Sequence, residues 1–592
     1  MNSDSPWVPA AFLVVLGGGL GGYKLYAAHQ AGTLTTGLLV LIAAGVLLLL
    51  AAVLVGAVRM LRGRARGDGK ARYLAPPGEL SGIKPSDARR SAARLLPGGD
   101  LRNPDNLGLP LGRTVRGKVV LRQDWESVGL IVAGPRIGKS TSYCVPAIVG
   151  APGAVVATSN KVDLHDTTRG VRELVGRVWL FDPQRLTGRE PEFWVDLLAP
   201  VVSLSAAREL AGTFHAAYVD PKASSDAFFT PTGVELVALA MFAAALGGGD
   251  LIHVTHWLGR PSDDTPATIL EGHGFHDAAE SLREKSTAAG NQRSGTYATA
   301  RLVMSVMDEP VFARWVTPTT RVEFVLRHDA ESGYQRVPQT ALRKSPPQLD
   351  LLEFVRSTDT LYALSKEGRG AATQLTAALV AQVFAAAERA AVSNGGRLGV
   401  PLVMVLDEAA NVCRIRELPD LYSHLGSRGV VVQTVLQSWS QGVRVWGDEG
   451  MQSLWTAANV KIYAGNNSED RFLQLLSNLI GPHEVRRRST SSSATGSSTS
   501  YSTALEPIFT VADLQSLPRG RALMLSAGNR PTLLRAVPWM DGPHAEAITA
   551  SAATYAGGGG LPAFVNGRLV GPTKPPSVDP LARPAPVKAL QW

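Results

Sequence analysis

Residues 127–149, SVGLIVAGPRIGKSTSYCVPAIV, run from an apolar stretch through a glycine-containing loop into a helical stretch. The spacing Ala-x4-Gly-Lys-Ser matches a phosphate-binding loop, with Ala133 at the position where glycine is commoner. Backbone N–H groups of such a loop point at phosphates, and the helix N-terminus adds a favourable dipole. In this motif Lys139 reaches the β- and γ-phosphate oxygens, and Ser140 ligates Mg²⁺. The predicted phosphate-binding residues are Ala133, Gly134, Pro135, Arg136, Ile137, Gly138, Lys139, Ser140 and Thr141.

A second part of the same site follows in residues 401–412, PLVMVLDEAANV, where an apolar run ends in two adjacent carboxylates. A buried strand that ends in this way suits a nucleotide hydrolase. Asp407 would hold Mg²⁺ through water, and Glu408 would orient or deprotonate the attacking water. The alternative is a strand that ends in a solvated acidic turn. The upstream phosphate-binding loop favours the catalytic interpretation.

Residues 423–441, SHLGSRGVVVQTVLQSWSQ, contain two further candidates for catalysis. Gln437 follows an expected strand, where a glutamine can sense the γ-phosphate. Arg428 ends an expected helix, and an arginine of a neighbouring subunit can stabilise transition-state charge as a finger. The alternative for Arg428 is a salt-bridged surface residue. Two weaker candidates for the finger are Arg414 and Arg416.

From residue 113 the chain alternates short β-branched runs with stretches rich in alanine and leucine. Continuous apolar strands that are separated by helices predict a largely parallel sheet covered on both faces. Residues 202–316 read as mostly helical and interrupt this alternation. The expected fold class is therefore α/β, a nucleotide-binding domain with an inserted all-α domain.

The chain divides into six predicted parts along its length. They are a transmembrane hairpin (1–58), a basic juxtamembrane segment and linker (59–112), the first part of the nucleotide-binding domain (113–201), a mostly helical insertion (202–345), the second part of the nucleotide-binding domain (346–545) and a flexible Gly/Pro-rich tail (546–592). Within the second part, the Ser/Thr-rich residues 489–503 predict a mobile loop.

The N-terminal region predicts a membrane anchor. Residues 34–58 carry no charge, and at ~1.5 Å per residue they can cross a ~30 Å hydrocarbon layer. Residues 7–23 are also uncharged and predict a second span. The alternative, a cleaved signal peptide, is disfavoured because the first residues lack a cationic region. Six cations in residues 59–72 place the C-terminal body in the cytoplasm and are expected to contact anionic lipid headgroups.

Composition limits the remaining possibilities. Hydrophobic residues make up 45% of the chain and charged residues 18%, which excludes a mostly disordered protein. Two cysteines, Cys144 and Cys413, cannot build a disulfide framework. Of the net charge of +9, five charges lie in residues 59–72 and three in residues 566–592. The near-neutral remainder gives no bulk-charge argument for DNA binding.

Two histidine pairs and an arginine run are weaker candidate sites. His253 and His256, and likewise His273 and His276, have the i,i+3 spacing that a zinc site can use. Neither pair has the Glu of a zincin motif, and histidines on the exposed face of a helical insertion are the commoner case. Residues 486–488, three arginines, are read as a solvated cation run rather than a phosphate contact.

Two N-terminal spans are followed along the chain by AGPRIGKST (133–141), VMVLDEAAN (403–411) and SRGVVVQTVLQSWSQ (427–441). This order of features resembles the TraG/TraD-type coupling proteins of type IV secretion and conjugation. The similarity covers roughly residues 1–545. The series of LDEAANV, QS and SQ is close to the form seen in actinobacterial members. It implies a RecA-like, FtsK-related motor domain with an inserted all-α domain, assembled as a homo-hexamer in the inner membrane. It also implies ATP-driven delivery of a relaxase–DNA complex or of protein substrates to a secretion channel.

The resemblance assigns roles to individual residues. It implies that Lys139, Ser140, Asp407, Glu408 and Gln437 serve ATP and Mg²⁺. The finger role of Arg428 depends on subunit packing. The short connection between the two spans, which leaves almost no periplasmic domain, departs from the family pattern.

Two alternative functions stay open at this point. One is a protein-export ATPase that recruits effectors without pumping DNA. The other is a membrane scaffold that binds nucleotide without productive turnover. Intact Lys139, Asp407 and Glu408 favour turnover over the scaffold.

Overall fold

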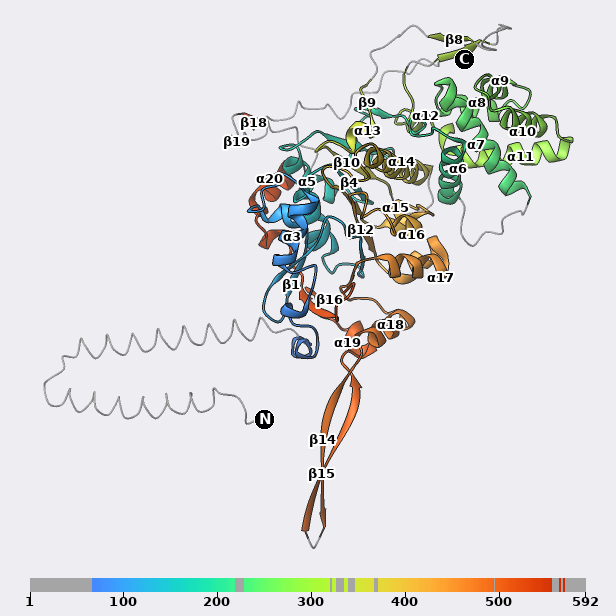
Figure 1. Cartoon of the computed structure of the whole chain (residues 1–592). Helices are drawn as coiled ribbons and strands as arrows, with labels where there is room; N and C mark the ends of the chain where they lie inside the picture. Colours follow the sequence, from blue (N-terminus) through green and yellow to red (C-terminus); the bar gives the residue numbers. More distant parts are fainter. Residues whose placement is uncertain are drawn as a thin grey trace, which may run out of the picture. The chain divides into compact units, whose positions relative to one another are not determined.

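The computed structural model describes residues 67–218, 228–319, 346–366, 371–493 and 496–555, together with the backbone of four short strands (Figure 1). The predicted spans, residues 7–23 and 34–58, lie outside the described residues, as does most of the predicted tail.

An eleven-stranded sheet forms the centre of the motor domain, in the order β2-β1-β17-β16-β13-β3-β12-β11-β4-β10-β5. Its strands are β1 (Leu109–Thr114), β2 (Val120–Gln123), β3 (Gly129–Val132), β4 (Val155–Ser159), β5 (Val178–Phe181), β10 (Thr360–Leu364), β11 (Leu402–Leu406), β12 (Val430–Leu436), β13 (Val460–Tyr463), β16 (Arg521–Ser526) and β17 (Thr532–Arg535). The seven strands from β13 to β5 run parallel, as predicted. The other four pair antiparallel and extend one edge of the sheet.

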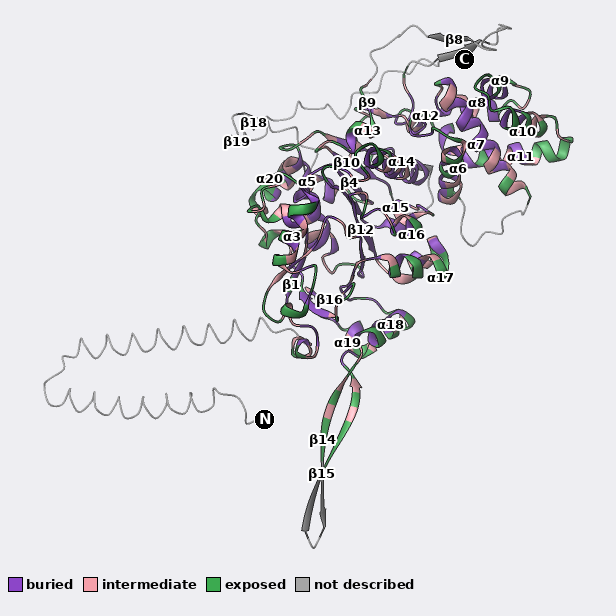
Figure 2. Cartoon of the chain, viewed as in Figure 1, coloured by how far each residue is buried: buried purple, intermediate pink, exposed green. Residues whose placement is uncertain are grey.

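Both faces of the sheet are buried, which explains its uninterrupted apolar strands. Successive side chains of a strand point to opposite faces. In β11, Leu402, Met404 and Leu406 belong to one hydrophobic cluster, whereas Val403 and Val405 belong to the other. Figure 2 shows the buried strands lying between layers of helices. The prediction of a sheet covered on both faces is confirmed.

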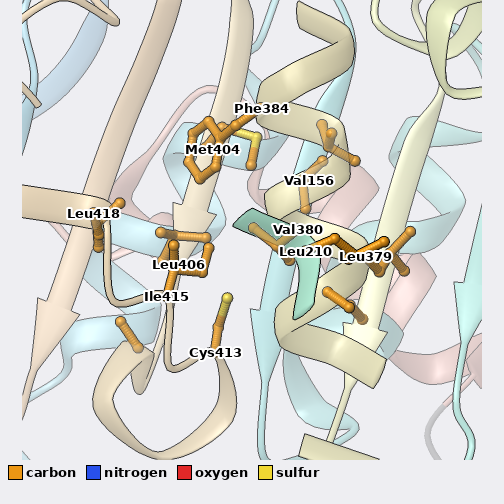
Figure 3. Close-up of a cluster of buried hydrophobic side chains, with 14 of the residues drawn as sticks. Val156, Leu210, Leu379, Val380, Phe384, Met404, Leu406, Cys413, Ile415 and Leu418 are labelled. Atoms are coloured by element: carbon orange, nitrogen blue, oxygen red, sulfur yellow. The ribbon is translucent and has the colours of Figure 1, made fainter. Parts of the chain in front are cut away.

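Helices cover these faces and connect the strands. They are α3 (Pro85–Leu95), α4 (Val145–Val149), α5 (Asp163–Arg172), α13 (Leu351–Phe354), α14 (Ala371–Ser393), α15 (Ala409–Val412), α16 (Leu418–Leu421), α17 (Trp439–Ala457), α18 (Asp470–Ile480), α19 (Val511–Gln515) and α20 (Ala545–Tyr555). In Figure 3, Phe384 and Val380 of α14 lie in one cluster with Met404 and Leu406 of β11. The long α14 therefore forms part of the layer on this face of the sheet.

The insertion between β5 and β10 is mostly helical, as predicted. Its helices are α6 (Leu204–Tyr218), α7 (Phe229–Gly247), α8 (Leu251–Leu258), α9 (Thr265–Gly272), α10 (His276–Thr287), α11 (Gly290–Val303) and α12 (Pro310–Ala313). Short strands accompany them: β6 (Trp194–Val195), β7 (Val322–Val325), β8 (Gln335–Pro338) and β9 (Gln348–Leu349). Helix α7 contacts α6, α9 and α11, and α6 contacts α14 of the motor domain.

Two of the described helices are long and apolar enough to cross a membrane, at Phe229–Gly247 and Ala372–Ser393. In the most apolar part of each, 56% and 72% of the residues are buried within the protein. A helix that is hydrophobic all round is typical of the core of a large protein. We interpret both as core helices, so they are only weak evidence for membrane association.

The Ser/Thr-rich segment departs from its prediction. A mobile loop was expected over residues 489–503, but the backbone forms a hairpin of β14 (Pro482–Ser493) and β15 (Gly496–Pro507). The register pairs Pro482 with Pro507 and Ser493 with Gly496. The reason is that strand pairing satisfies the backbone groups of both arms whatever the side chains are. Composition alone therefore overstated the irregularity of this segment.

Two predicted boundaries also need correction. The linker part of segment 59–112, residues 73–112, was expected to pack on the surface, but Leu80, Ala88 and Ala92 are fully buried in the second hydrophobic cluster. The tail was expected to begin at residue 546, but α20 packs against α5, with Ile548 buried. Alanine has the highest helix propensity, so this alanine-rich stretch continues the fold up to the glycine run.

Candidate nucleotide-binding site

The predicted phosphate-binding loop lies between β3 and a helical turn that begins at Ser140. The loop needs glycine at two positions. A side chain at Gly134 would meet the backbone oxygen of Asn466, and Gly138 has a φ of +89°. Ala133 is fully buried in the core and its N–H donates to Leu436 O at 3.0 Å. A methyl group is therefore accommodated where the motif more often has glycine.

Glu408 receives hydrogen bonds from two other predicted site residues. Lys139 Nζ lies 3.0 Å from Glu408 Oε1, and Gln437 Nε2 donates to the same oxygen at 2.6 Å. Both side chains of the ion pair are more than nine-tenths buried, so water screens their attraction only weakly. Glu408 also adopts a left-handed φ of 54°. Backbone strain of this kind clusters at functional sites.

Asp407 lies beside this group and faces Ser140. Ser140 Oγ donates to Asp407 Oδ2 at 3.3 Å, and the aspartate is buried. Burial, followed by the charge of Glu408, raises the pKa of Asp407 to about 6. Among the described residues, its other oxygen, Oδ1, has no hydrogen-bond partner although it is buried. A buried carboxylate oxygen without a partner, next to a serine hydroxyl, fits the oxygen ligands that Mg²⁺ prefers.

The sheet order explains why these residues meet. Strands β3, β12 and β11 are adjacent and parallel, so their carboxyl ends lie at one edge. Lys139 follows β3, Gln437 follows β12, and Asp407 and Glu408 follow β11. Ligands of open parallel sheets bind outside the carboxyl ends of the strands. Residues separated by 269 positions along the chain thus form one site.

Arg428 does not join this cluster. It precedes β12 at the amino end of the strand, where its Nη1 donates to Gly396 O at 3.3 Å. Gln437 lies nine positions further along the chain, which at ~3.3 Å per residue is about 30 Å along an extended strand. Arg428 therefore cannot reach the phosphates held by its own chain. Of the weaker candidates, Arg414 donates to Ala410 O at 3.2 Å, and Arg416 is exposed.

Sequence reasoning missed residues in the connection between β13 and α18. Gly134 N–H donates to Gly465 O at 3.0 Å, and Asn466 Nδ2 donates to Pro135 O at 2.8 Å. Glu469 accepts the N–H groups of Trp439 and Ser440, the first two residues of α17. The connection thus ties the phosphate-binding loop to the helix that follows Gln437. The available signal was GNNSED, an Asn-rich turn after a strand of the same sheet.

One histidine of the first pair caps a helix, and both histidines of the second pair are exposed. His253 Nδ1 accepts the N–H of Asp250 at 3.0 Å and completes the capping box of α8. His273 and His276 are exposed. Among the described residues, no group of three or more His, Cys, Asp or Glu side chains is arranged to hold a metal ion.

Two family models match the chain. The model described as "Type IV secretory system Conjugative DNA transfer" matches residues 102–324. The model described as "TraM recognition site of TraD and TraG" matches residues 401–519. Together they cover more than half of the chain and include both the phosphate-binding loop and the Asp407-Glu408 strand end. A comparison with curated protein sequences found no match.

Similar solved structures include coupling proteins. The conjugative coupling protein TrwBdeltaN70 with sulphate is 17% identical over 70% of this chain and 86% of its own, with a TM-score of 0.49. TrwB with the ATP analogue ADPNP is 16% identical over 70% and 86%, with a TM-score of 0.48. VirB4 of Thermoanaerobacter pseudethanolicus is 13% identical over 74% and 98%, with a TM-score of 0.40.

Proposed function

Because the chain belongs to the TraG/TraD-type coupling protein family, we propose that it is an inner-membrane ATPase that drives conjugative DNA into a type IV secretion channel. The observation that carries the proposal is the buried contact of Lys139 and Gln437 with Glu408. Together with Asp407 and Ser140, it supports a site that both binds and hydrolyses a nucleoside triphosphate.

The substrate, ATP, would bind with its phosphates on residues 133–141. The loop amides would bind phosphate oxygens, and Lys139, which is paired with Glu408 in the structure, would exchange this partner for the γ-phosphate. That exchange frees Glu408 Oε1 to accept a proton from the attacking water. Gln437, which already donates to Glu408, would hold this carboxylate and the water in position.

Ser140 and Asp407 would hold Mg²⁺, which when bound neutralises charge on the phosphates. The partnerless Oδ1 of Asp407 supports this assignment. Metal binding requires the ionised carboxylate, and the raised pKa of Asp407 means that the proton is held more tightly before the metal binds.

The complete site requires a second subunit. Arg428 is too far from its own phosphate-binding loop, so its proposed role as an arginine finger must act on a neighbouring copy. A homo-hexamer, anchored through residues 7–23 and 34–58, would supply such neighbours. The expected partners are a relaxase–DNA complex, the channel components, and anionic lipids at residues 59–72.

ATP hydrolysis by the full chain in detergent or in vesicles, with and without single- and double-stranded DNA, tests this proposal. We expect hydrolysis that DNA stimulates and that Glu408→Gln abolishes. A protein that hydrolyses ATP but shows neither stimulation nor salt-dependent DNA binding would favour the protein-export alternative. Undiminished transfer activity of Glu408→Gln would instead favour the scaffold that does not turn over.

A further inference from the structure

Three arginines lie in one row across the antiparallel edge of the sheet. In the pairing of β1 with β17, Arg113 lies directly opposite Arg535. In the pairing of β16 with β17, Arg521 lies directly opposite the same Arg535. Side chains that are directly opposite in an antiparallel pair project from one face, with their Cβ atoms about 5 Å apart. The fold therefore holds three positive charges side by side on adjacent strands.

Such a row lowers stability unless an anion covers it, because like charges directly opposite each other in a sheet repel. The side chains of Arg113 and Arg535 are exposed, and neither forms a hydrogen bond or an ion pair with the described residues. Arg521 is buried, and its Nη1 donates to the backbone oxygen of Gly520 at 3.3 Å. The two exposed charges are thus available to a ligand.

A β-bulge in β1 places Arg113 in this row. Leu111 belongs to the second hydrophobic cluster, so strict alternation would put Arg113 on the same face as Leu111. The register of β1 with β2 shifts between residues 110 and 112, which turns Arg113 to the face of Arg535. Gly112 permits this close approach, because a side chain there would meet the backbone oxygen of Arg535 at 2.9 Å. Bulges that redirect a side chain in this way are common near functional sites.

The row ends close to the phosphate-binding loop. Leu523, two residues after Arg521 in β16, pairs with Tyr463, the last residue of β13. Two residues beyond Tyr463, the oxygen of Gly465 accepts the N–H of Gly134 in the loop at 3.0 Å. In the strand order, only β13 separates β16 from β3, the strand that leads into the loop. A ligand on the row would therefore lie near the nucleotide site without being part of it.

The chemistry of the row fits the phosphates of a nucleic acid better than an acidic protein surface. Neighbouring strands lie ~4.8 Å apart, so the row extends over about 10 Å. A nucleic acid strand carries one phosphate per ~3.4 Å of helix axis, so about three phosphates match this length. Guanidinium groups bind phosphate through two parallel hydrogen bonds. Protein interfaces have apolar anchors, whereas none of the described exposed large hydrophobic side chains lies in β1, β16 or β17.

We propose that Arg113, Arg535 and Arg521 form a strip that binds the phosphate backbone of the transported DNA strand. This inference rests on the proposed function, because the proposed substrate supplies the phosphates. Contacts with phosphates carry no sequence information, so the strip should bind DNA of any sequence. The nucleotide site described above uses none of these three arginines.

Binding of labelled single-stranded DNA to the full chain in detergent tests the assignment. Fluorescence anisotropy gives Kd for two unrelated sequences over a series of salt concentrations. Each phosphate contact contributes ~0.7 to the slope of log K against log salt. We expect the double variant Arg113→Ala/Arg535→Ala to lower this slope by about 1.4, which corresponds to about 25-fold weaker binding at 0.1 M salt. Both sequences should respond equally.

A charge reversal separates binding from folding. In Arg535→Glu the new carboxylate would lie opposite both Arg113 and Arg521, and opposite charges in a cross-strand pair are stabilising. This variant should melt no lower than the wild type and should lose DNA affinity at least as strongly as the double variant. The matched control, Arg89→Ala/Arg102→Ala, removes two exposed cations outside the row and should keep Kd within about 2-fold of the wild type.

Three outcomes would overturn the assignment. If the row variants bind DNA with the wild-type slope, the DNA lies elsewhere. If the control double variant weakens binding equally, the effect is one of net charge. If the row variants lose affinity for poly-glutamate but keep affinity for DNA, the row binds an acidic protein surface.

Failure of the proposed function is a separate result, because DNA binding is measured without nucleotide and needs no hydrolysis. A chain that binds DNA through the row but does not hydrolyse ATP would contradict the proposed function and support the assignment of the row. A chain whose hydrolysis is stimulated by DNA, with row variants that bind DNA like the wild type, would do the reverse.

Discussion

The two ends of strand β12 (Val430–Leu436) differ in burial and in partners. At the carboxyl end, Gln437 donates to Glu408, which is buried and paired with Lys139. At the amino end, Arg428 is only half-buried, and its side chain donates to the backbone oxygen of Gly396. The carboxyl end therefore has its chemistry assembled within one chain, whereas the amino end presents a cation outward.

Under the proposed function, this difference means that a single chain contains only part of the catalytic machinery. The residues proposed to hold phosphate and activate water meet at one edge of the sheet because parallel strands end there. The proposed finger, Arg428, lies at the opposite edge and would act on another copy. A site with a substituted Glu408 should consequently stay impaired whichever neighbour it has, whereas a site beside an Arg428 variant should be repaired when a neighbour supplies an intact arginine.

The largest effect is expected at the carboxyl end. Glu408→Gln should lower kcat by about 10³- to 10⁴-fold, because the amide cannot accept the proton of the attacking water. Nucleotide binding should persist, since Lys139 loses its carboxylate partner and remains free for phosphate. Steady-state hydrolysis and ADP titration measure the two effects separately.

A matched control is Glu449→Gln, an exposed glutamate of α17, which should leave kcat unchanged. Retention of substantial hydrolysis by Glu408→Gln would contradict the assignment of Glu408 as the base. The carboxyl end of β12 would then hold a structural ion pair rather than a catalytic group.

The next effect is expected at the amino end. Arg428→Ala should lower kcat by about 10³-fold, because transition-state charge loses its arginine, with ADP affinity unchanged. Mixing Arg428→Ala with Glu408→Gln chains should restore part of the activity. In a mixed ring, some sites pair an intact Glu408 with an intact Arg428 of the neighbour.

Arg89→Ala, at an exposed arginine of α3, serves as the control and should behave as wild type. If Arg428→Ala hydrolyses ATP normally, Arg428 is a surface residue without a role in catalysis. Only the carboxyl end of β12 would then contribute to hydrolysis. A loss of activity that mixing never repairs would place the defect within one chain.

The same comparison shows what the sequence could and could not predict. The motif spacing around Lys139 and the carboxylates after an apolar strand were sufficient to predict the carboxyl end, because strand order in a parallel sheet brings such ends together. Asn466 and Arg519 escaped prediction because their contacts are with backbone oxygens of the loop, and Glu469 escaped because its contacts are with backbone N–H groups at the start of α17. The hairpin over residues 482–507 escaped because serine and threonine content describes side chains and not backbone pairing.

A smaller effect is expected from the sensor glutamine. Gln437→Ala should lower kcat by about 10²-fold, a typical cost of removing one positioned donor, because Glu408 and the water lose a fixed partner. Gln437→Glu should be at least as harmful, since it places a second carboxylate against Glu408. Gln452→Ala, at an exposed glutamine of α17, is the matched control. If both Gln437 variants keep the kcat of the control variant, Gln437 has only a structural role.

The smallest effect concerns the pH dependence of stability that the buried carboxyl group of Asp407 contributes. Burial and the charge of Glu408 raise the pKa of Asp407 from its usual 3.8 to about 6, so the metal-free folded state holds a proton that the unfolded state releases. Stability from this group is therefore present below about pH 4 and is lost as the pH rises through about 6.

Asp407→Asn removes this dependence. In the absence of Mg²⁺, the variant should unfold a few degrees higher than wild type at pH 7.5, and the difference should shrink towards pH 4. Added Mg²⁺ should stabilise wild type and not the variant, because the metal needs the ionised carboxylate. Asp420→Asn, at an exposed aspartate beyond the site, should show neither trend. A thermal shift that is the same at both pH values would mean that the pKa of Asp407 does not differ between the folded and unfolded states, and the carboxyl edge of the sheet would then add no pH dependence to stability.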